Sequence, residues 1–193
     1  MTLQNVIFLD RDGVINRDSP DYVKSWEEFE FLPGSLGALA ALTRAGYHLI
    51  VITNQSIIGR GMVPLSVLED MFRRMRRAVE AAGGKIFDIY YCPHHPDDQC
   101  DCRKPEPGMI FQAKTAHGID LPCTVMIGDN IKDVLCGQNA GCGATMLVRT
   151  GCGGQAEKAL AAKQVSPTLV VDDLAAAADL ILSEPPLPPV CCG

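Results

Sequence analysis

Short apolar runs recur along this chain, and most of them are followed at once by polar residues. The first run, Val6 to Leu9, is wholly apolar and partly β-branched, which predicts a buried strand of a parallel sheet. Helical patterns lie between the runs, so strand and helix alternate. We therefore predict an α/β fold with a doubly wound, Rossmann-like, mostly parallel sheet. Further strands are predicted at 48–52, 86–91, 124–129, 144–148 and 168–171.

Periodicity and turn residues mark the helices between these strands. One helix is expected to start at Ser35, to carry Leu36, Leu39 and Leu42 on one face, and to stop before Gly46. Ser66 and Glu69 have the spacing of a capping box and predict the start of a second helix. Its apolar stripe and the remaining helices follow from the same reasoning: Leu68, Met71, Phe72, Met75 and Val79, then helices over 107–116, up to 139, and after Asp172 or Asp173.

Length, charge and cysteine content limit what the protein can be. The chain has 193 residues and a formal net charge of −6. We expect a single domain over 1–183, followed by a proline-rich tail over 184–193 that is disordered. The acidic balance argues against a nucleic-acid partner, and no apolar stretch approaches the roughly 20 residues that span a bilayer. There is no signal-peptide pattern, and the nine cysteines favour metal binding in a reducing cytoplasm over a disulfide framework. We expect a cytoplasmic monomer without membrane attachment.

Acidic and polar side chains follow several of the predicted strands. Asp10 and Asp12 end the first run, Thr53 ends the second, and Asp129 ends a later one. Ligands bind open α/β sheets at the carboxyl ends of the strands, so these side chains should line one crevice. Carboxylates close together need a cation, a proton or a basic partner, and Mg²⁺ favours a few carboxylates, water and a substrate phosphate. The competing interpretation of the first stretch is an ordinary Asp- and Gly-rich turn.

A basic pair, Arg103 and Lys104, completes this set of residues. Thr53 and Lys104 could donate hydrogen bonds to a phosphate. A carboxylate at the metal could attack phosphorus to give an aspartyl-phosphate, and an acid two residues away could protonate the leaving oxygen and later activate water. These residues therefore predict phosphoryl chemistry.

A second metal site is predicted in the segment YCPHHPDDQCDCRKP. Cys92, His94, Cys100 and Cys102 supply three thiolates and one imidazole, which is a closed tetrahedral set for Zn²⁺. His95 is the alternative imidazole, and a loop with free thiols is the alternative to any metal. The set leaves no coordination position open, so we expect the zinc to be structural. The last ligand directly precedes Arg103 and Lys104, so the metal should help to position them.

Four motifs together resemble the haloacid dehalogenase superfamily of phosphatases: DxDGV, a strand-end Thr, a Lys before Pro, and GDxxxD. The resemblance implies that Asp10 is the nucleophile and Asp12 the general acid/base, with Thr53 and Lys104 holding the phosphoryl group. It also implies Mg²⁺ on Asp10, Asp129 and the backbone carbonyl of Asp12, with Asp133 supporting these ligands. The chain has no long insert where this superfamily carries a cap domain, so we expect a capless enzyme.

Within that superfamily, the stretches DRDGVIN, TNQS, CPHHP, CDCRKP and LVRTG are similar to the zinc-loop branch of histidinol-phosphate and heptose-bisphosphate phosphatases. The resemblance implies a phosphorylated sugar as substrate, namely removal of the C7 phosphate of heptose 1,7-bisphosphate in lipopolysaccharide core precursor synthesis. Ser56 favours this substrate, and histidinol phosphate is the alternative. An alternative of another class is a non-catalytic zinc-loop binding module. The substrate contacts implied are Asp18, Ser19, Pro20, Asp21, Tyr22, Thr53, Asn54, Gln55, Ser56, Arg103, Lys104 and Asn130.

Two positions depart from the pattern of this branch. Ile57 follows TNQS where glycine is common, which affects the conformation expected for the loop. Asn130 follows Asp129 where many members carry lysine, so a weaker substrate contact is expected there.

Overall fold

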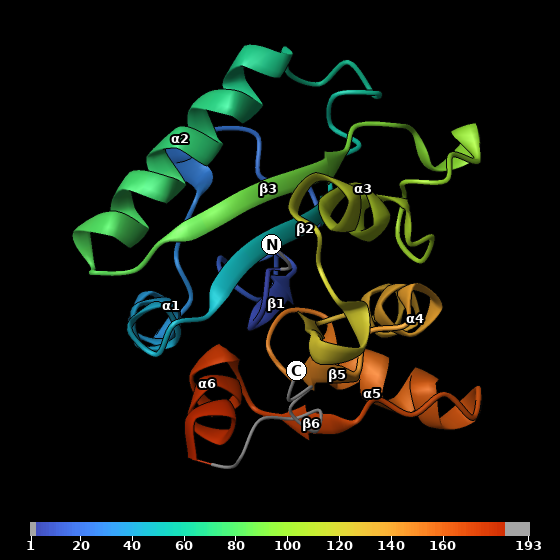
Figure 1. Cartoon of the computed structure of the whole chain (residues 1–193). Helices are drawn as coiled ribbons and strands as arrows, with labels where there is room; N and C mark the ends of the chain where they lie inside the picture. The colour runs from blue at the N-terminus through green and yellow to red at the C-terminus, as the bar shows by residue number, and fades with distance from the viewer. Residues whose placement is uncertain (1–2, 184–193) are drawn as a thin grey trace.

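A computed structural model describes residues 3–183, and the predicted tail over 184–193 lies outside them. The described residues form a six-stranded sheet, all parallel, in the order β3-β2-β1-β4-β5-β6 (Figure 1). The order runs outward in both directions from β1 and β4, so the predicted doubly wound parallel sheet is confirmed. The strands are β1 (Val6–Leu9), β2 (His48–Asn54), β3 (Ile86–Cys92), β4 (Val125–Gly128), β5 (Ala144–Val148) and β6 (Leu169–Val171).

Helices cover both faces of the sheet. In Figure 1, α1, α2 and α6 lie on one side, and α3, α4 and α5 lie on the other. Short 3₁₀ turns occupy Trp26–Glu28, Pro96–Asp98 and Leu121–Cys123. The helices are α1 (Ser35–Arg44), α2 (Leu65–Ala81), α3 (Gly108–His117), α4 (Ile131–Ala140), α5 (Gly153–Ala162) and α6 (Leu174–Ser183).

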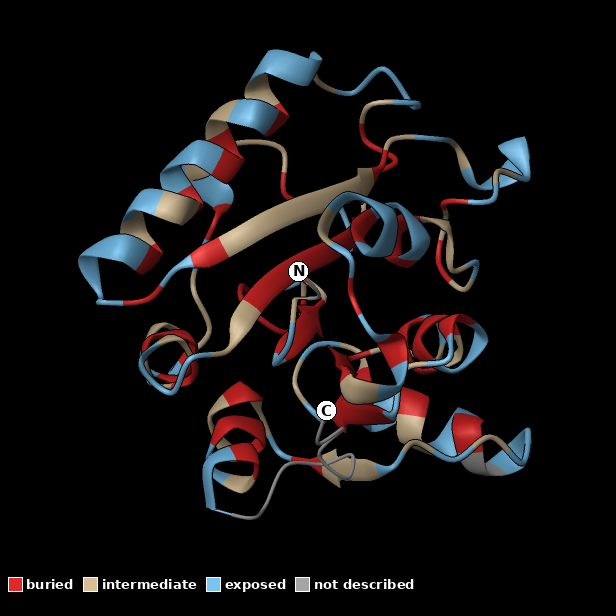
Figure 2. Cartoon of the chain, viewed as in Figure 1, coloured by how far each residue is buried: buried red, intermediate tan, exposed pale blue. Residues whose placement is uncertain are grey.

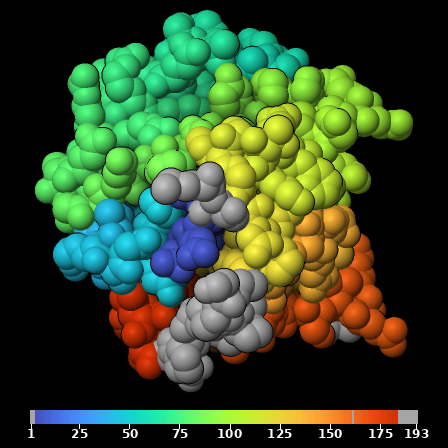
Figure 3. Space-filling view, in the orientation of Figure 1, coloured from blue at the N-terminus to red at the C-terminus, as the bar shows by residue number. Residues whose placement is uncertain are grey.

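The central strands are buried on both faces, which explains why their sequences are continuously apolar (Figure 2). In β1, Ile7 and Leu9 belong to the core under α1, α2 and α6, whereas Val6 and Phe8 belong to the core under α3 and α4. The space-filling view shows the segment around α1 packed against α6 (Figure 3). This contact joins an early and a late part of the chain. Helices thus cover both faces of the sheet, and its parallel strands all end at one edge.

The start of α2 differs from the prediction. The helix begins at Leu65 after an extended Pro64, and no side chain caps it. The predicted capping box at Ser66 and Glu69 is therefore wrong, because Ser66 already lies in the first helical turn, where its hydroxyl cannot act as an N-cap. The predicted apolar stripe of α2, from Leu68 to Val79, is buried as expected.

The connections that follow the strands are short or irregular. Residues 10–34, after β1, contain a single 3₁₀ turn, and so do residues 93–107, after β3. No cap domain is inserted at either place among the described residues. The helix α5 was not predicted, because its residues combine two initial glycines with only one large apolar side chain, Leu160. None of the described helices is long and apolar enough to cross a membrane.

Candidate active site

A cavity of about 260 Å³ lies at the carboxyl end of the sheet. The ends of β1, β2 and β4 bring Asp10, Thr53 and Asp129 to it, because parallel strands all end at the same edge. The zinc loop, which we define as residues 92–102, leads directly to Arg103 and Lys104 at the same cavity. The full lining is Asp10, Asp12, Asp18, Ser19, Pro20, Tyr22, Thr53, Asn54, Arg103, Lys104, Asp129, Asn130, Lys132, Asp133 and Cys152.

A buried lysine joins two of the carboxylates. Lys104 Nζ lies 2.8 Å from Asp10 Oδ1 and 2.6 Å from Asp133 Oδ1, and the lysine side chain is 2 % exposed. Asp10 Oδ1 also accepts a hydrogen bond of 2.7 Å from the backbone N–H of Arg11. Asp133 Oδ2 accepts from the backbone N–H of Asn130 as part of the N-terminal cap of α4. The lysine is thus fixed between the end of β1 and the start of α4.

Asp129 is held by a loop that follows β5. Its Oδ2 accepts a hydrogen bond of 2.7 Å from the backbone N–H of Cys152. Two glycines flank this carboxylate with positive φ angles: a Cβ on Gly13 or on Gly151 would lie 2.1 Å from Asp129 Oδ2. Thr150 Oγ1 donates to the backbone carbonyl of Gly13, 2.6 Å away, and ties the two loops together. The packing around Asp129 therefore requires glycine at both positions.

The carboxylates form a cluster that a hard cation could fill. Carboxylate oxygens of Asp10, Asp129 and Asp133 all lie within 4.8 Å of one another. Burial raises the pKa of Asp10 from 3.8 to about 7. The positive charge of Lys104 lowers this pKa and the negative charge of Asp133 raises it, but burial has the largest effect. Burial and the charges of Asp10 and Asp133 raise the pKa of Asp129 to about 8. Two acids that resist ionisation in the absence of a cation are chemically suited to bind one.

The same carboxylates act on the lysine in the opposite direction. Burial alone would lower the pKa of Lys104, but the charges of Asp10 and Asp133 outweigh it and raise the pKa above its ordinary value. Lys104 is therefore a permanent cation across the physiological pH range.

Asp12 is oriented by a set of donors that the sequence did not reveal. Its Oδ1 accepts from Arg11 Nε at 3.0 Å, from Arg11 Nη2, and from Asn16 Nδ2 at 2.9 Å. Its Oδ2 accepts from Gln55 Nε2 at 3.0 Å, and the same amide nitrogen lies 2.8 Å from Thr53 Oγ1. Arg11 is 1 % exposed, yet Asp12 remains 21 % exposed toward the cavity. The carboxylate is accessible but cannot rotate freely.

The predicted substrate residues are divided by the structure into two groups. Asp18, Ser19, Pro20, Tyr22, Thr53, Asn54, Arg103, Lys104 and Asn130 line the cavity together with the predicted catalytic acids. Asp21, Gln55 and Ser56 do not line it: Asp21 is exposed, whereas Gln55 and Ser56 are buried. Gln55 instead contacts Asp12. Two lining residues were not predicted, Lys132 and Cys152. The motif LVRTG directly before Cys152 was the available signal for that loop.

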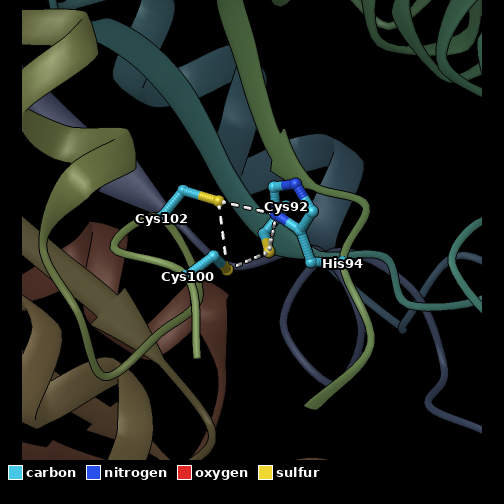
Figure 4. A group of neighbouring side chains, drawn as sticks. All are labelled: Cys92, His94, Cys100 and Cys102. Atoms are coloured by element: carbon cyan, nitrogen blue, oxygen red, sulfur yellow. Dashed lines mark hydrogen bonds between the residues drawn. The ribbon is translucent and has the colours of Figure 1, made fainter. Parts of the chain in front are cut away.

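The zinc loop brings the four predicted ligands together (Figure 4). Cys92 Sγ lies 3.5 Å from Cys100 Sγ, and Cys102 Sγ lies 3.4 Å from Cys100 Sγ and 3.2 Å from His94 Nδ1. All four donor atoms lie within 4.8 Å of one another. A tetrahedral zinc with bonds of roughly 2.0–2.3 Å separates its ligands by about 3.5 Å, so this donor set could hold Zn²⁺.

His95 is not part of this cluster. Its Nδ1 accepts from the backbone N–H of Asp97, 3.3 Å away, and caps the short turn at Pro96–Asp98. Of the two neighbouring imidazoles, His94 is therefore the one positioned beside the three thiols.

The segment that follows the zinc loop is tied to the cavity through Asn54. Its Oδ1 accepts from the backbone N–H of Lys104 at 3.1 Å, and its Nδ2 donates to the Lys104 carbonyl at 3.2 Å. The backbone N–H of Gln55 also donates to the Cys92 carbonyl at 2.8 Å. The position of Lys104 thus depends on the end of β2 as well as on the zinc loop.

Comparison with known proteins places this arrangement in a family. A HAD-hydrolase-like family model matches residues 101–177. The chain is 45 % identical over 179 residues to the D-glycero-β-D-manno-heptose-1,7-bisphosphate 7-phosphatase of Pseudomonas aeruginosa, covering 93 % of this chain and 98 % of the relative. The chain therefore belongs to the family of these heptose-bisphosphate phosphatases. The corresponding phosphatase of Bordetella bronchiseptica is 43 % identical, and the match covers 93 % of this chain and 98 % of that relative.

Solved structures of this heptose-bisphosphate phosphatase family have the same fold. The B. bronchiseptica D,D-heptose 1,7-bisphosphate phosphatase, complexed with magnesium and phosphate, matches with a TM-score of 0.87 and 42 % identity, over 93 % of this chain and 98 % of that one. The enzyme from Burkholderia thailandensis matches with a TM-score of 0.71 and 36 % identity, over 94 % and 100 % of the two chains. The resemblance predicted from the sequence motifs is confirmed.

Proposed function

We propose that this protein is a Mg²⁺-dependent phosphatase that removes the C7 phosphate of D-glycero-D-manno-heptose 1,7-bisphosphate, in the synthesis of ADP-heptose precursors of the lipopolysaccharide core. The observation that carries the proposal is the contact of Lys104 with Asp10 in one cavity with Thr53 and Asp129. This cavity belongs to a chain that is 45 % identical to a phosphatase of that name. The non-catalytic module is disfavoured, because the set of acids and the lysine is complete.

The catalytic metal would be held by Asp10, Asp129 and the backbone carbonyl of Asp12. Burial raises the pKa of Asp10 to about 7 and that of Asp129 to about 8, and a bound cation would stabilise the ionised forms of both acids. Asp133 belongs to the same cluster, but Lys104 and the N–H of Asn130 contact its two oxygens, so its role is to support the site. The metal would supply charge neutralisation, which allows an anionic phosphate to approach an anionic nucleophile.

The reaction proceeds in two steps. A carboxylate oxygen of Asp10 attacks the phosphorus, the bond to the sugar oxygen breaks, and Asp12 gives that oxygen its proton. Water then attacks the phosphorus of the aspartyl-phosphate, Asp12 takes the proton from the water, and phosphate leaves with the Asp10 carboxylate restored. Thr53 and Lys104 would donate to the phosphoryl oxygens in both steps.

The clamp on Asp12 supports its role as the acid and base. A general acid must reach the leaving oxygen in a fixed direction. The contacts from Arg11, Asn16 and Gln55 hold the carboxyl group in one orientation, and its exposed edge faces the cavity.

The second metal would be a structural Zn²⁺ on Cys92, His94, Cys100 and Cys102. The four side chains point toward one another and leave no open position for a substrate (Figure 4). Its effect on catalysis would be indirect, through the position of Arg103 and Lys104. The cytoplasmic location, the monomeric state and all of the substrate contacts remain predictions.

The deciding experiment compares kcat/KM for heptose 1,7-bisphosphate and for histidinol phosphate, with Mg²⁺ present. The cavity and the family predict a clear preference for the bisphosphate. The variant Asp10→Asn serves as a control for contaminating phosphatases. A preference for histidinol phosphate would replace the proposed substrate, and the absence of Mg²⁺-dependent hydrolysis of either would refute the proposed activity.

A further inference from the structure

Tyr22 lines the reaction cavity in a backbone conformation that residues with a side chain rarely adopt. Its φ angle is +62°, in the left-handed region, where the Cβ atom is crowded. Among the described non-glycine residues with positive φ, Tyr22 alone lines this cavity. Such a conformation persists only where the surrounding structure holds it, so the groups that contact Tyr22 must fix its position.

Tyr22 is held from its own turn and from a separate loop. Its backbone N–H donates to the Ser19 carbonyl, 3.0 Å away, and closes the turn. Its half-buried ring packs against the edge of the core under α1 and α2. The guanidinium carbon of Arg60 lies over the ring, 5.6 Å from its centroid, which is within the range of a cation–π interaction. A cation from outside the turn therefore contacts the aromatic wall of the cavity.

Arg60 is fixed at its base by the loop that follows β2. Its backbone N–H donates to the Ser56 carbonyl at 2.9 Å, and its Nε donates to Ser56 Oγ at 3.4 Å. Ser56 is itself buried. The Arg60 side chain thus starts from an anchored turn, although its surface is exposed.

The residue before Arg60 locks this loop against the zinc loop. The backbone N–H of Gly59 donates to the Pro93 carbonyl, 2.8 Å away. A Cβ on Gly59 would lie 2.7 Å from that carbonyl oxygen and 2.8 Å from the backbone nitrogen of His95. The two loops are therefore in direct backbone contact, which fixes the point from which Arg60 reaches Tyr22.

The charge of Arg60 is not used in an ion pair within the described part of the chain. Arg60 also does not line the reaction cavity. Its side chain contacts Ser56 Oγ and the Tyr22 ring. An effect of Arg60 on a ligand in the cavity would therefore be transmitted by Tyr22.

We propose that Arg60 is a positioning residue for the phosphatase reaction, and that it holds the Tyr22 ring as a wall against which the organic part of the phosphate ester packs. This inference rests on the proposed function, because it needs a phosphate ester in the reaction cavity. An aromatic ring offers apolar contact in a cavity otherwise lined mainly by charged and polar groups. A ring that is already held in place loses less conformational freedom when the ester binds.

The test is a double-mutant cycle measured with heptose 1,7-bisphosphate and Mg²⁺. Arg60→Gln should raise KM about three- to fivefold, the effect of one exposed cation–π contact, and keep kcat within about twofold of wild type. In a Tyr22→Leu background the same change should have no further effect, because leucine offers no ring face to the cation. In a Tyr22→Phe background the rise in KM should return. The matched control is Arg77→Gln, an exposed arginine on α2 that lines no part of the reaction cavity and should change neither constant.

Three results would overturn the proposal. One is an unchanged KM in Arg60→Gln. Another is an equal rise in KM with and without the Tyr22 ring, which would show that Arg60 acts on the substrate by another route. The third is a loss of kcat at constant KM. The unfolding temperatures of all variants should stay close to wild type, since the contact lies at the surface.

A binding measurement separates this inference from the proposed activity. Titration calorimetry would compare the affinity of heptose 1,7-bisphosphate for Asp10→Asn and for Asp10→Asn combined with Arg60→Gln. Binding about three- to fivefold weaker in the double variant supports the role of Arg60 even if wild type proves inactive on the bisphosphate, which would refute the proposed function alone. Equal binding by the two variants, or no binding by either, would refute the role of Arg60.

Discussion

Two clusters of this protein are assembled in different ways: the carboxylate cluster, and the zinc cluster, which is named after the metal proposed for Cys92, His94, Cys100 and Cys102. The four proposed zinc ligands come from one segment, residues 92–102, with few regular elements to hold them. The carboxylates of Asp10, Asp129 and Asp133 come from the ends of β1 and β4 and from the start of α4, and the buried sheet fixes them. The first cluster should therefore depend on its metal for its shape, whereas the second should keep its shape without one.

The two clusters meet at Lys104. This residue follows the zinc loop by two positions, contacts Asp10 and Asp133 through its ammonium group, and is held by Asn54 through its backbone. Damage to the carboxylate cluster should remove the chemistry and leave the zinc in place. Damage to the zinc cluster should weaken the chemistry indirectly.

The largest effect is expected for Asp10→Asn. Loss of the nucleophile should lower kcat by at least about 10³-fold. The unfolding temperature at pH 8 without Mg²⁺ should not fall, because the change removes a buried acid whose pKa is raised to about 7. Zinc content should stay the same. Activity of a folded variant near the wild-type level would contradict the aspartyl-phosphate mechanism.

A smaller loss is expected when the zinc cluster is broken, and the two neighbouring histidines provide the contrast. His94→Ala should lower zinc content and reduce kcat/KM by roughly one to two orders of magnitude, because loss of the metal would misplace Lys104. His95→Ala should retain zinc, because this ring caps a turn outside the cluster. Elemental analysis and activity are measured on both variants. Zinc loss in His95→Ala with retention in His94→Ala would reverse the ligand assignment.

The rigidity of the carboxylate cluster can be tested at Gly151. A Cβ there would lie 2.1 Å from Asp129 Oδ2 and 2.7 Å from Gly13 Cα, so Gly151→Ala should displace Asp129. We expect activity to fall about tenfold or more, with a higher Mg²⁺ requirement. Gly141→Ala is the matched control, since Gly141 also has a positive φ but no atom within 4 Å of its added Cβ. That variant should lose about 1–2 kcal/mol of stability and little activity. Equal activity losses in the two variants would show that strain alone, and not contact with Asp129, is responsible.

The smallest effect concerns pH and stability. The pKa values of Asp10 and Asp129 are raised from 3.8 to about 7 and about 8, so between pH 4 and 8 the folded protein binds more protons than the unfolded chain. Its free energy of unfolding should therefore fall as the pH rises through this window. In protein dialysed free of Mg²⁺ but still containing zinc, the unfolding temperature should be roughly 10 °C lower at pH 8.5 than at pH 5.5.

Adding Mg²⁺ should reverse this loss most strongly at high pH, where both acids are ionised. Calorimetric scans at several pH values, with and without Mg²⁺, measure the effect. If the stability of the Mg²⁺-free protein instead rises over this pH range, the surroundings of the two acids do not disfavour their ionisation.

The same contrast explains what the sequence could and could not predict. The Cys/His cluster was predictable because the spacing of its four residues is local, and the placement of Asp10, Thr53 and Asp129 was predictable because each lies at the end of an apolar strand. The contacts that fix these residues were not predictable, because they join distant segments. The N–H of Cys152 reaches Asp129, and Gln55 reaches Asp12 across 43 positions.

Local signals also failed where the surrounding structure took precedence. The spacing of Ser66 and Glu69 matched a capping box, but α2 begins earlier in the chain, at Leu65 directly after Pro64. The helix α5 has two glycines at its start and little periodicity, and it is held by packing of Ala156 and Leu160 against Val134 and Leu147. Periodicity alone could not indicate such packing.

The most direct test of the proposed function is the position of the phosphate that remains after the reaction. Heptose 1,7-bisphosphate is incubated with the enzyme and Mg²⁺, and the products are followed by phosphorus NMR. The account predicts one equivalent of inorganic phosphate and heptose 1-phosphate, with the C1 phosphate intact, and no reaction with Asp10→Asn. Release of the C1 phosphate with heptose 7-phosphate left in solution, or no Mg²⁺-dependent release at all, would contradict it.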